Sequence, residues 1–243
     1  MRIANGIEML ELPTATGTAF YHPTVFFDET SVVLVDTGTP GNYGKLMELI
    51  RNAGLSTEKL NAVVLTHQDF DHIGSLPPFL DIDGIDVYAH ESDKPYIDGL
   101  LPLIKVPEDR LTMMLGQLSP DVADQYRSVY SDATPPVVNR ILNDGETLPF
   151  AGGTIVIHTP GHTPGHICLY HPRSKTLIAG DAMIVHEGKL MGPNPPFTPD
   201  MNLALRSLGR LSQYDIEKVI CFHGGLFEDR VNDRIAELAA QAN

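Results

Sequence analysis

Short apolar runs of strand character alternate along the chain with segments whose apolar residues recur at helical spacing. Runs rich in Val, Ile and Leu predict strands around 7–12, 20–27, 31–35, 62–65, 86–89, 154–158, 166–170, 176–179 and 218–222. Apolar residues that share one helical face, such as Leu46, Leu49 and Ile50, predict helices at 41–53, 72–80, 200–213 and 227–241. Pro77 and Pro78 cut the second of these short. This order predicts an α+β fold, in which two β-rich halves carry helices on their outer faces as an αββα four-layer sandwich.

The domain organisation predicted from the sequence is simple. The 243 residues suit one compact domain, and no low-complexity linker divides the chain. We therefore predict a single domain over residues 1–243 with a helical insertion at about 99–136. Three interpretations of the insertion stay open: a layer packed on the sandwich, a homodimer interface, or a cap over a binding site. The apolar lining of such a cap would be Leu100, Leu101, Leu103, Ile104, Met113 and Met114.

Composition and charge narrow the range of partners. Hydrophobic residues make up 42% of the chain and charged residues 20%, which is typical of a soluble globular protein. A net charge of −14 without any basic run disfavours nucleic acid as a partner. No stretch reaches the roughly 20 apolar residues that span a membrane, and residues 1–8 have no signal-peptide character, so we expect a cytoplasmic protein. Cys168 and Cys221 lie in apolar runs and are expected to be small buried hydrophobes.

The segment Thr66-His67-Gln68-Asp69-Phe70-Asp71-His72 carries four groups that can bind metal directly after the apolar run 62–65. Imidazoles and carboxylates on a tight loop can face one point, and divalent metals take such nitrogen and oxygen ligands. The alternative is a polar turn in which an Asp caps the next helix.

Three later segments favour the metal interpretation. His162 follows the run 154–157, Asp181 follows 175–179 and His223 follows 218–222, each beside glycine. Side chains at the carboxyl ends of buried strands are where layered sheet folds assemble their sites. Four strand ends that each deliver a potential ligand predict one shared metal site.

Together these positions resemble the metallo-β-lactamase-fold superfamily over nearly the whole chain. The family pattern is H-x-H-x-D-H, then a single His, an Asp and a last His, and the matching residues here are His67, Asp69, Asp71, His72, His162, Asp181 and His223. Val35-Asp36-Thr37-Gly38 also resembles the V-D-T-G turn of the superfamily, in which the Asp supports the site. The pattern is specific for fold and much less so for substrate.

The resemblance implies two divalent metal ions per chain. His67, Asp69 and His162 would hold the first, Asp71, His72 and His223 the second, and Asp181 would bridge them. Position 69 departs from the family pattern, because it is Asp where His is commonest. A third carboxylate makes the first site harder and moves its preference from zinc toward iron or manganese. The alternative is that Asp69 lies outside the ligand set and orients a neighbouring His.

The resemblance points to a hydrolase of the lactonase type. A metal-bound hydroxide would open an ester-type bond, most simply a lactone such as an N-acyl homoserine lactone, and Asp71 would be both ligand and proton carrier. The substrate would be a small molecule with an apolar acyl part. Alternatives are a thioesterase of the glyoxalase II type, a mononuclear iron oxidoreductase of the persulfide dioxygenase type, and a non-catalytic metal-stabilised binding protein.

Several further positions are candidates for roles around the site. His186 and Asp36 are predicted to support the ligands or to contact the substrate, and His166 is a weaker candidate for the same role. Tyr21 and Tyr170 are candidate donors to a developing oxyanion. The loop from Gly188 to Pro199 follows Asp181 closely and is predicted to form a wall of the pocket.

Overall fold

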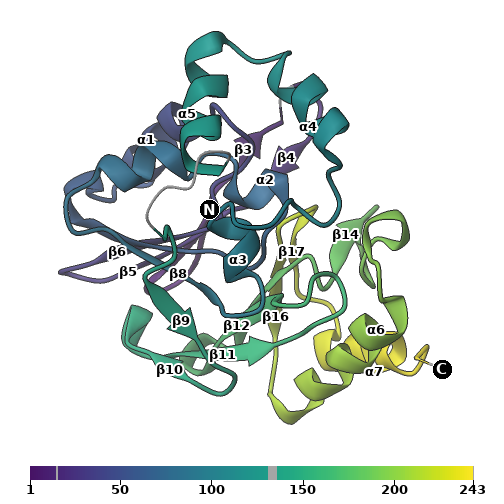
Figure 1. The fold of residues 1–243 in the computed structure, drawn as a ribbon. Coiled ribbons are helices and arrows are strands. Elements are labelled where there is room, and N and C mark those ends of the chain that lie inside the picture. Colours follow the sequence, from purple (N-terminus) through teal and green to yellow (C-terminus); the bar gives the residue numbers. More distant parts are fainter. Residues whose placement is uncertain (15, 131–135, 243) are drawn as a thin grey trace.

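The computed structural model describes residues 1–14, 16–130 and 136–242, without the side chains of residues 128 and 129. Residues 131–135 of the predicted insertion, and residue 243 at the end of the predicted domain, lie outside the described part. Two large sheets form the body of the molecule (Figure 1). The first has seven strands in the order β1 (Arg2–Ala4), β2 (Ile7–Met9), β5 (Thr24–Phe27), β6 (Val32–Val35), β7 (Leu60–Val64), β8 (Asp86–His90) and β9 (Arg140–Leu142). The second has six, in the order β10 (Thr147–Leu148), β11 (Thr154–His158), β12 (Ile167–His171), β13 (Thr176–Gly180), β16 (Lys218–Cys221) and β17 (Gly225–Phe227).

Helices cover the outer faces of both sheets. In Figure 1, α1 and α5 lie together beside the first sheet, and α6 and α7 lie beside the second. The helix bounds are α1 Tyr43–Asn52, α2 Phe70–Ile73, α3 Lys94–Ile97, α4 Glu108–Leu115, α5 Pro120–Tyr130, α6 Met201–Gly209 and α7 Val231–Ala239. Two small hairpins complete the described strands: β3 (Leu12–Pro13) with β4 (Phe20–Tyr21), and β14 (Ile184–His186) with β15 (Lys189–Met191). None of the helices in the described residues combines the length and apolar character that a membrane span requires.

Three separate apolar cores lie between these four layers. On β6, Val32 and Leu34 pack into the core under α1, while Val33 and Val35 pack between the two sheets. This division follows from the two-residue period of a strand, because successive side chains point to opposite faces. The third core lies between the second sheet and helices α6 and α7, and it contains both cysteines, which are buried and unpaired as expected. The predicted α+β sandwich is confirmed.

The region after the first ligand cluster differs from the expectation in detail. The predicted helix at 72–80 begins earlier, at Phe70, ends at Ile73, and is followed by a short 3-10 turn over Pro77–Asp81. The difference has a local cause, because Asp69 adopts extended backbone before the helix and so becomes the residue that precedes its first turn. Asp71 and His72 therefore lie on the first helical turn.

The insertion packs mainly as an outer layer. Leu103, Leu115 and Tyr126 are buried in the core under α1. Of the residues predicted to line a cap, Leu100 and Met113 are 65% and 59% exposed, and Leu101 and Ile104 are exposed as well. Met114 is the one member of the predicted cap lining that lines a cavity of about 400 Å³ beside Asp69 and Asp71, together with its neighbours Lys105, Val106 and Arg110. The insertion thus combines a packing layer with part of a cavity wall.

Candidate metal centre

Strand direction explains why the candidate ligands meet. Strands β11 and β13 both pair antiparallel with β12, and β16 pairs parallel with β13, so these three end at the same edge of the second sheet. That edge supplies His162, Asp181 and His223. In the first sheet, β6 and β7 are parallel neighbours, so Asp36 and the loop that holds His67 follow adjacent strand ends. This arrangement is the one predicted from the sequence, in which several strand ends meet at one site.

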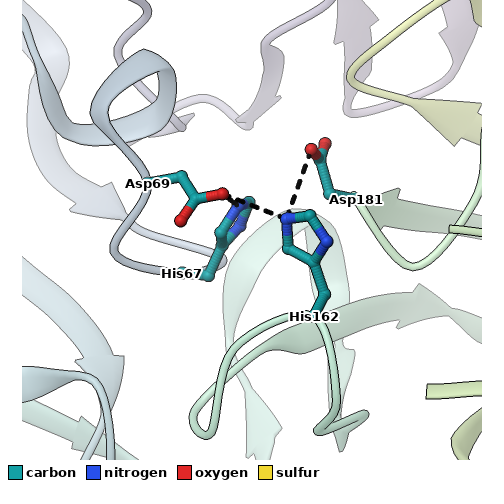
Figure 2. Close-up of side chains that lie close together, drawn as sticks. All are labelled: His67, Asp69, His162 and Asp181. Atoms are coloured by element: carbon teal, nitrogen blue, oxygen red, sulfur yellow. Dashed lines mark hydrogen bonds and ion pairs between the residues drawn. The ribbon is translucent and has the colours of Figure 1, made fainter. Parts of the chain in front are cut away.

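The first group joins His67, Asp69, His162 and Asp181, which point toward one another in Figure 2. The Oδ2 atom of Asp69 lies 3.3 Å from Nε2 of His67 and 3.1 Å from Nε2 of His162. Nε2 of His162 lies 3.5 Å from Oδ2 of Asp181. Asp69 therefore presents one oxygen to the same space as both histidines.

The second group joins Asp71, His72 and His223. Nε2 of His223 lies 3.2 Å from Oδ2 of Asp71 and 3.3 Å from Oδ2 of Asp181. Nε2 of His72 lies 3.3 Å from Oδ1 of Asp181 and 4.0 Å from Asp71. Asp181 faces both groups, the first through His162 and the second through His72 and His223.

These spacings fit divalent cations. Two ligand atoms of a tetrahedral site, each about 2.1 Å from the ion, lie roughly 3.4 Å apart. The nitrogen–oxygen distances within the two groups, apart from that between His72 and Asp71, range from 3.1 to 3.5 Å. Nε2 of His67, Nε2 of His72 and Oδ1 of Asp181 are buried and have no hydrogen-bond partner among the described residues. Buried polar atoms normally have partners, so this His/Asp cluster is compatible with a divalent metal site.

Burial and neighbouring charges shift the histidine pKa values of the two groups in opposite directions. Burial lowers the pKa of His67 to about 4, which keeps its imidazole neutral and ready to donate a lone pair. Burial acts in the same direction on His223, but the Asp181 and Asp71 carboxylates outweigh it and raise its pKa to about 10. His72 likewise has a pKa well above its usual value, because three carboxylates, with Asp36 the strongest, outweigh burial. A cation at the second group would therefore displace protons.

Each of three candidate histidine ligands contacts a supporting residue through its other ring nitrogen. Nδ1 of His72 lies 2.9 Å from Oδ2 of Asp36, and Nδ1 of His67 lies 2.9 Å from the Thr66 hydroxyl. Nδ1 of His162 lies 3.2 Å from the Thr198 hydroxyl. Asp36 also accepts hydrogen bonds from the backbone N–H and the hydroxyl of Thr66, and its φ of 63° is the left-handed conformation that Asp tolerates better than most residues. Such partners fix ring orientation and tautomer in metal sites.

His166 and His186, the two supporting candidates among the histidines, differ in burial and in their contacts with the site. His186 is exposed on β14 and is not among the residues that line the cavity beside Asp69 and Asp71, so its role as a support or substrate contact stays a prediction. His166 is fully buried, and its Nε2 accepts a hydrogen bond from the backbone N–H of Asp181 at 3.0 Å. Gly180 makes this approach feasible, because a Cβ at that position would lie 2.8 Å from the same Nε2 atom.

Two supporting residues had no signal in the sequence. Lys105, from the insertion, places its ammonium nitrogen 2.6 Å from Oδ2 of Asp69. Asp93 is fully buried and accepts hydrogen bonds from the N–H of Gln68, the hydroxyl of Thr163 and the N–H of Gly165. Asp93 therefore ties together the two loops that carry His67 and His162. Both residues contact partners more than twenty positions away in the sequence, and local sequence patterns do not predict such contacts.

A cavity of about 400 Å³ opens over both groups. Its lining residues are Tyr21, Thr39, Asp69, Phe70, Asp71, Lys105, Val106, Arg110, Met114, Asp181, Ile184, Asn194, Phe197 and His223. Asn194 and Phe197 belong to the loop from Gly188 to Pro199, which was predicted to form a wall. Of the two tyrosine candidates, Tyr21 lines the cavity, whereas the Tyr170 hydroxyl donates to the carbonyl of Asp215. The centre is thus open to a small molecule on one side.

Comparisons with known proteins agree with this geometry. A sequence profile described as the metallo-β-lactamase superfamily matches residues 17–223. The probable metallo-hydrolase YflN of Bacillus subtilis is 31% identical over 205 residues, which cover 80% of this chain and 75% of that protein. The hydroxyacylglutathione hydrolase GloC of Haemophilus influenzae is 26% identical over 162 residues, 65% of this chain and 64% of that one. The crystal structure of the metallo-β-lactamase family protein TTHA1429 from Thermus thermophilus superposes with a TM-score of 0.72 at 28% identity, over 98% of this chain and 80% of that one.

Proposed function

This chain belongs to the metallo-β-lactamase superfamily, and from that membership we propose that it is a metal-dependent hydrolase that opens an ester-type bond, preferably that of a lactone. The observation that carries the proposal is the meeting of two His/Asp groups beneath a cavity of about 400 Å³. Pockets for small molecules typically measure about 300–1,000 Å³. Phe70, Met114, Ile184 and Phe197 give this one an apolar wall that suits the acyl chain of an ester or lactone.

We assign the seven side chains to two divalent cations that share Asp181: His67, Asp69 and His162 to one, and Asp71, His72 and His223 to the other. Such cations polarise a carbonyl oxygen and lower the pKa of a water molecule. The convergence of one Asp69 oxygen with two histidine nitrogens supports its assignment as a direct ligand. Its carboxylate favours iron or manganese over zinc at that position.

Asp71 is the catalytic carboxylate in this proposal. Burial works to raise its pKa, but His72 and His223 outweigh burial and lower it, so the carboxylate is ionised. Its side chain is 26% exposed and lines the cavity, where it can take a proton from the attacking water and pass it to the leaving alkoxide. Tyr21 lines the same cavity, and burial raises its pKa to about 12, so its phenol stays protonated and can donate to the carbonyl oxygen.

A thioesterase is the second candidate. The similarity to a relative named hydroxyacylglutathione hydrolase favours it, because hydrolysis of a thioester uses the same carbonyl chemistry. The two candidates differ in the leaving group, which is a tethered alkoxide in a lactone and a thiolate in a thioester. Substrate preference therefore separates them.

The test combines metal analysis with a substrate panel. Protein purified without chelator is expected to contain two divalent ions per chain and to hydrolyse lactones with a higher kcat/KM than thioesters of matched acyl length. The reverse preference would assign the thioesterase. One iron per chain with oxygen uptake on a persulfide would overturn the hydrolase, and full metal occupancy without turnover of any ester, thioester or lactone would leave a binding protein.

A further inference from the structure

We propose that Lys105 and Arg110 form a carboxylate-binding subsite beside the metal centre, so that the substrate is an ester or lactone that also carries a carboxylate. This inference rests on the proposed function and specifies its substrate class. Both residues belong to the insertion, and both line the cavity above the two His/Asp groups. They are the two Lys or Arg side chains among its lining residues, in a chain whose net charge is −14.

The ammonium group of Lys105 has N–H donors that are not used within the described part of the protein. Its side chain is 10% exposed, and its ammonium contacts Asp69 at 2.6 Å. An ammonium group has three N–H donors, and among the described residues Asp69 is the one acceptor that this ammonium reaches. The remaining N–H donors lie at the cavity wall, where a bound carboxylate can accept hydrogen bonds from them.

Arg110 has no acceptor of its own. It is an exposed residue on the first half of α4 that lines the cavity, and none of the hydrogen bonds or ion pairs of the described residues involves its guanidinium. A guanidinium presents a planar fork of donors that matches a carboxylate in two parallel hydrogen bonds, so a substrate carboxylate is the natural partner for this one.

The charge balance of the loaded site points the same way. Asp69, Asp71 and Asp181, with Asp36 behind His72, contribute four negative charges, and two divalent cations would contribute four positive ones. Lys105 and Arg110 then raise the sum from 0 to +2. A neutral lactone leaves this excess uncompensated in a partly closed cavity, whereas a carboxylate on the acyl arm reduces it.

The decisive experiment compares two non-cleavable amide ligands on the metal-loaded protein, one with a terminal carboxylate and one with its methyl ester. Calorimetry on the wild-type protein should show tighter binding of the carboxylate. In Arg110→Gln the preference should fall about tenfold, the size expected when a charge-assisted hydrogen bond is lost. The matched control is Arg127→Gln, which removes an exposed arginine of the same insertion that pairs with Asp124 outside the cavity. Its preference should equal that of the wild type.

Several outcomes would overturn the subsite. Equal binding of the two amides by the wild type would do so, and so would a preference that survives Arg110→Gln, since it would then come from the cations of the centre alone. The corresponding pair of 4-nitrophenyl esters separates this failure from failure of the proposed function. If both esters are hydrolysed but the carboxylate gives no advantage in kcat/KM, the proposed hydrolase activity is supported and the proposed subsite is contradicted. If neither ester is hydrolysed while the amide preference depends on Arg110, the hydrolase falls and the subsite stands.

Discussion

The two halves of the candidate metal centre differ in how far they are closed off from solvent. In the first half, the side chains of His67 and His162 are 0% and 1% exposed, and Lys105 covers Asp69. In the second half, the side chain of His223 is 37% exposed and that of Asp71 is 26% exposed. The cavity is lined by Asp69 and Asp181 as well as by Asp71 and His223, but the side chains of Asp71 and His223 are the more exposed, so we call the first half enclosed and the second half open.

This difference suggests a division of labour. In the enclosed half, Thr66 and Thr198 contact the outer ring nitrogens of His67 and His162, and Lys105 contacts Asp69. The open half holds Asp71, the more exposed of the carboxylates that line the cavity, and the backbone carbonyl of its His223 accepts a hydrogen bond from the N–H of Val185. We expect substitutions in the enclosed half to change which metal binds and how tightly, and substitutions in the open half to change turnover.

Asp181→Ala should impair both halves of the centre, because Asp181 faces both of them. Loss of a shared ligand should lower kcat/KM by at least about a thousandfold, beyond the 10–100-fold typical of residues that only support a ligand. Metal content per chain, measured by mass spectrometry, should fall in parallel. Asp215→Ala, which removes an exposed aspartate paired with Lys175, is the matched control and should change neither value. Retention of both ions by Asp181→Ala would remove its assignment as the shared ligand.

Asp69→His should change the enclosed half alone. Replacing a carboxylate by imidazole should shift the preference of that half from iron toward zinc by about tenfold, measured by competition between the two metals. The variant should also melt at a lower temperature, since Lys105 loses its carboxylate while remaining largely buried. Adding Lys105→Met to Asp69→His should restore part of that stability. An unchanged metal preference would mean that Asp69 orients the histidines without binding the ion.

The layers of the fold and the candidate ligands could be predicted from the sequence, because both leave local patterns in it. Buried strands have a two-residue period, and potential ligands at strand ends stand out beside glycines, as at Asp181. Lys105 and Asp93 carry no such local signal, because their roles depend on contacts made 36 and up to 72 residues away. The contact between His166 and the backbone of Asp181 has no local signal either, because it joins a loop before β12 to the end of β13, and the role of His186 stays a prediction.

Lys105→Met should change the metal affinity of the enclosed half alone. The ammonium of Lys105 contacts the same Asp69 oxygen that faces His67 and His162, so it competes with a cation for that oxygen and repels its charge. At roughly 4 Å, the repulsion between like charges near a protein surface is worth several kcal/mol before water and salt screen it, so an increase of about tenfold in the affinity of the enclosed half is a conservative expectation. Chelator competition should show this increase in one of the two ions and no change in the other. Lys175→Met, which removes a surface lysine paired with Glu217, should leave both affinities unchanged. Weaker binding in Lys105→Met would instead mean that the lysine holds the Asp69 carboxylate in place, and that the gain from orientation exceeds the cost of the added positive charge.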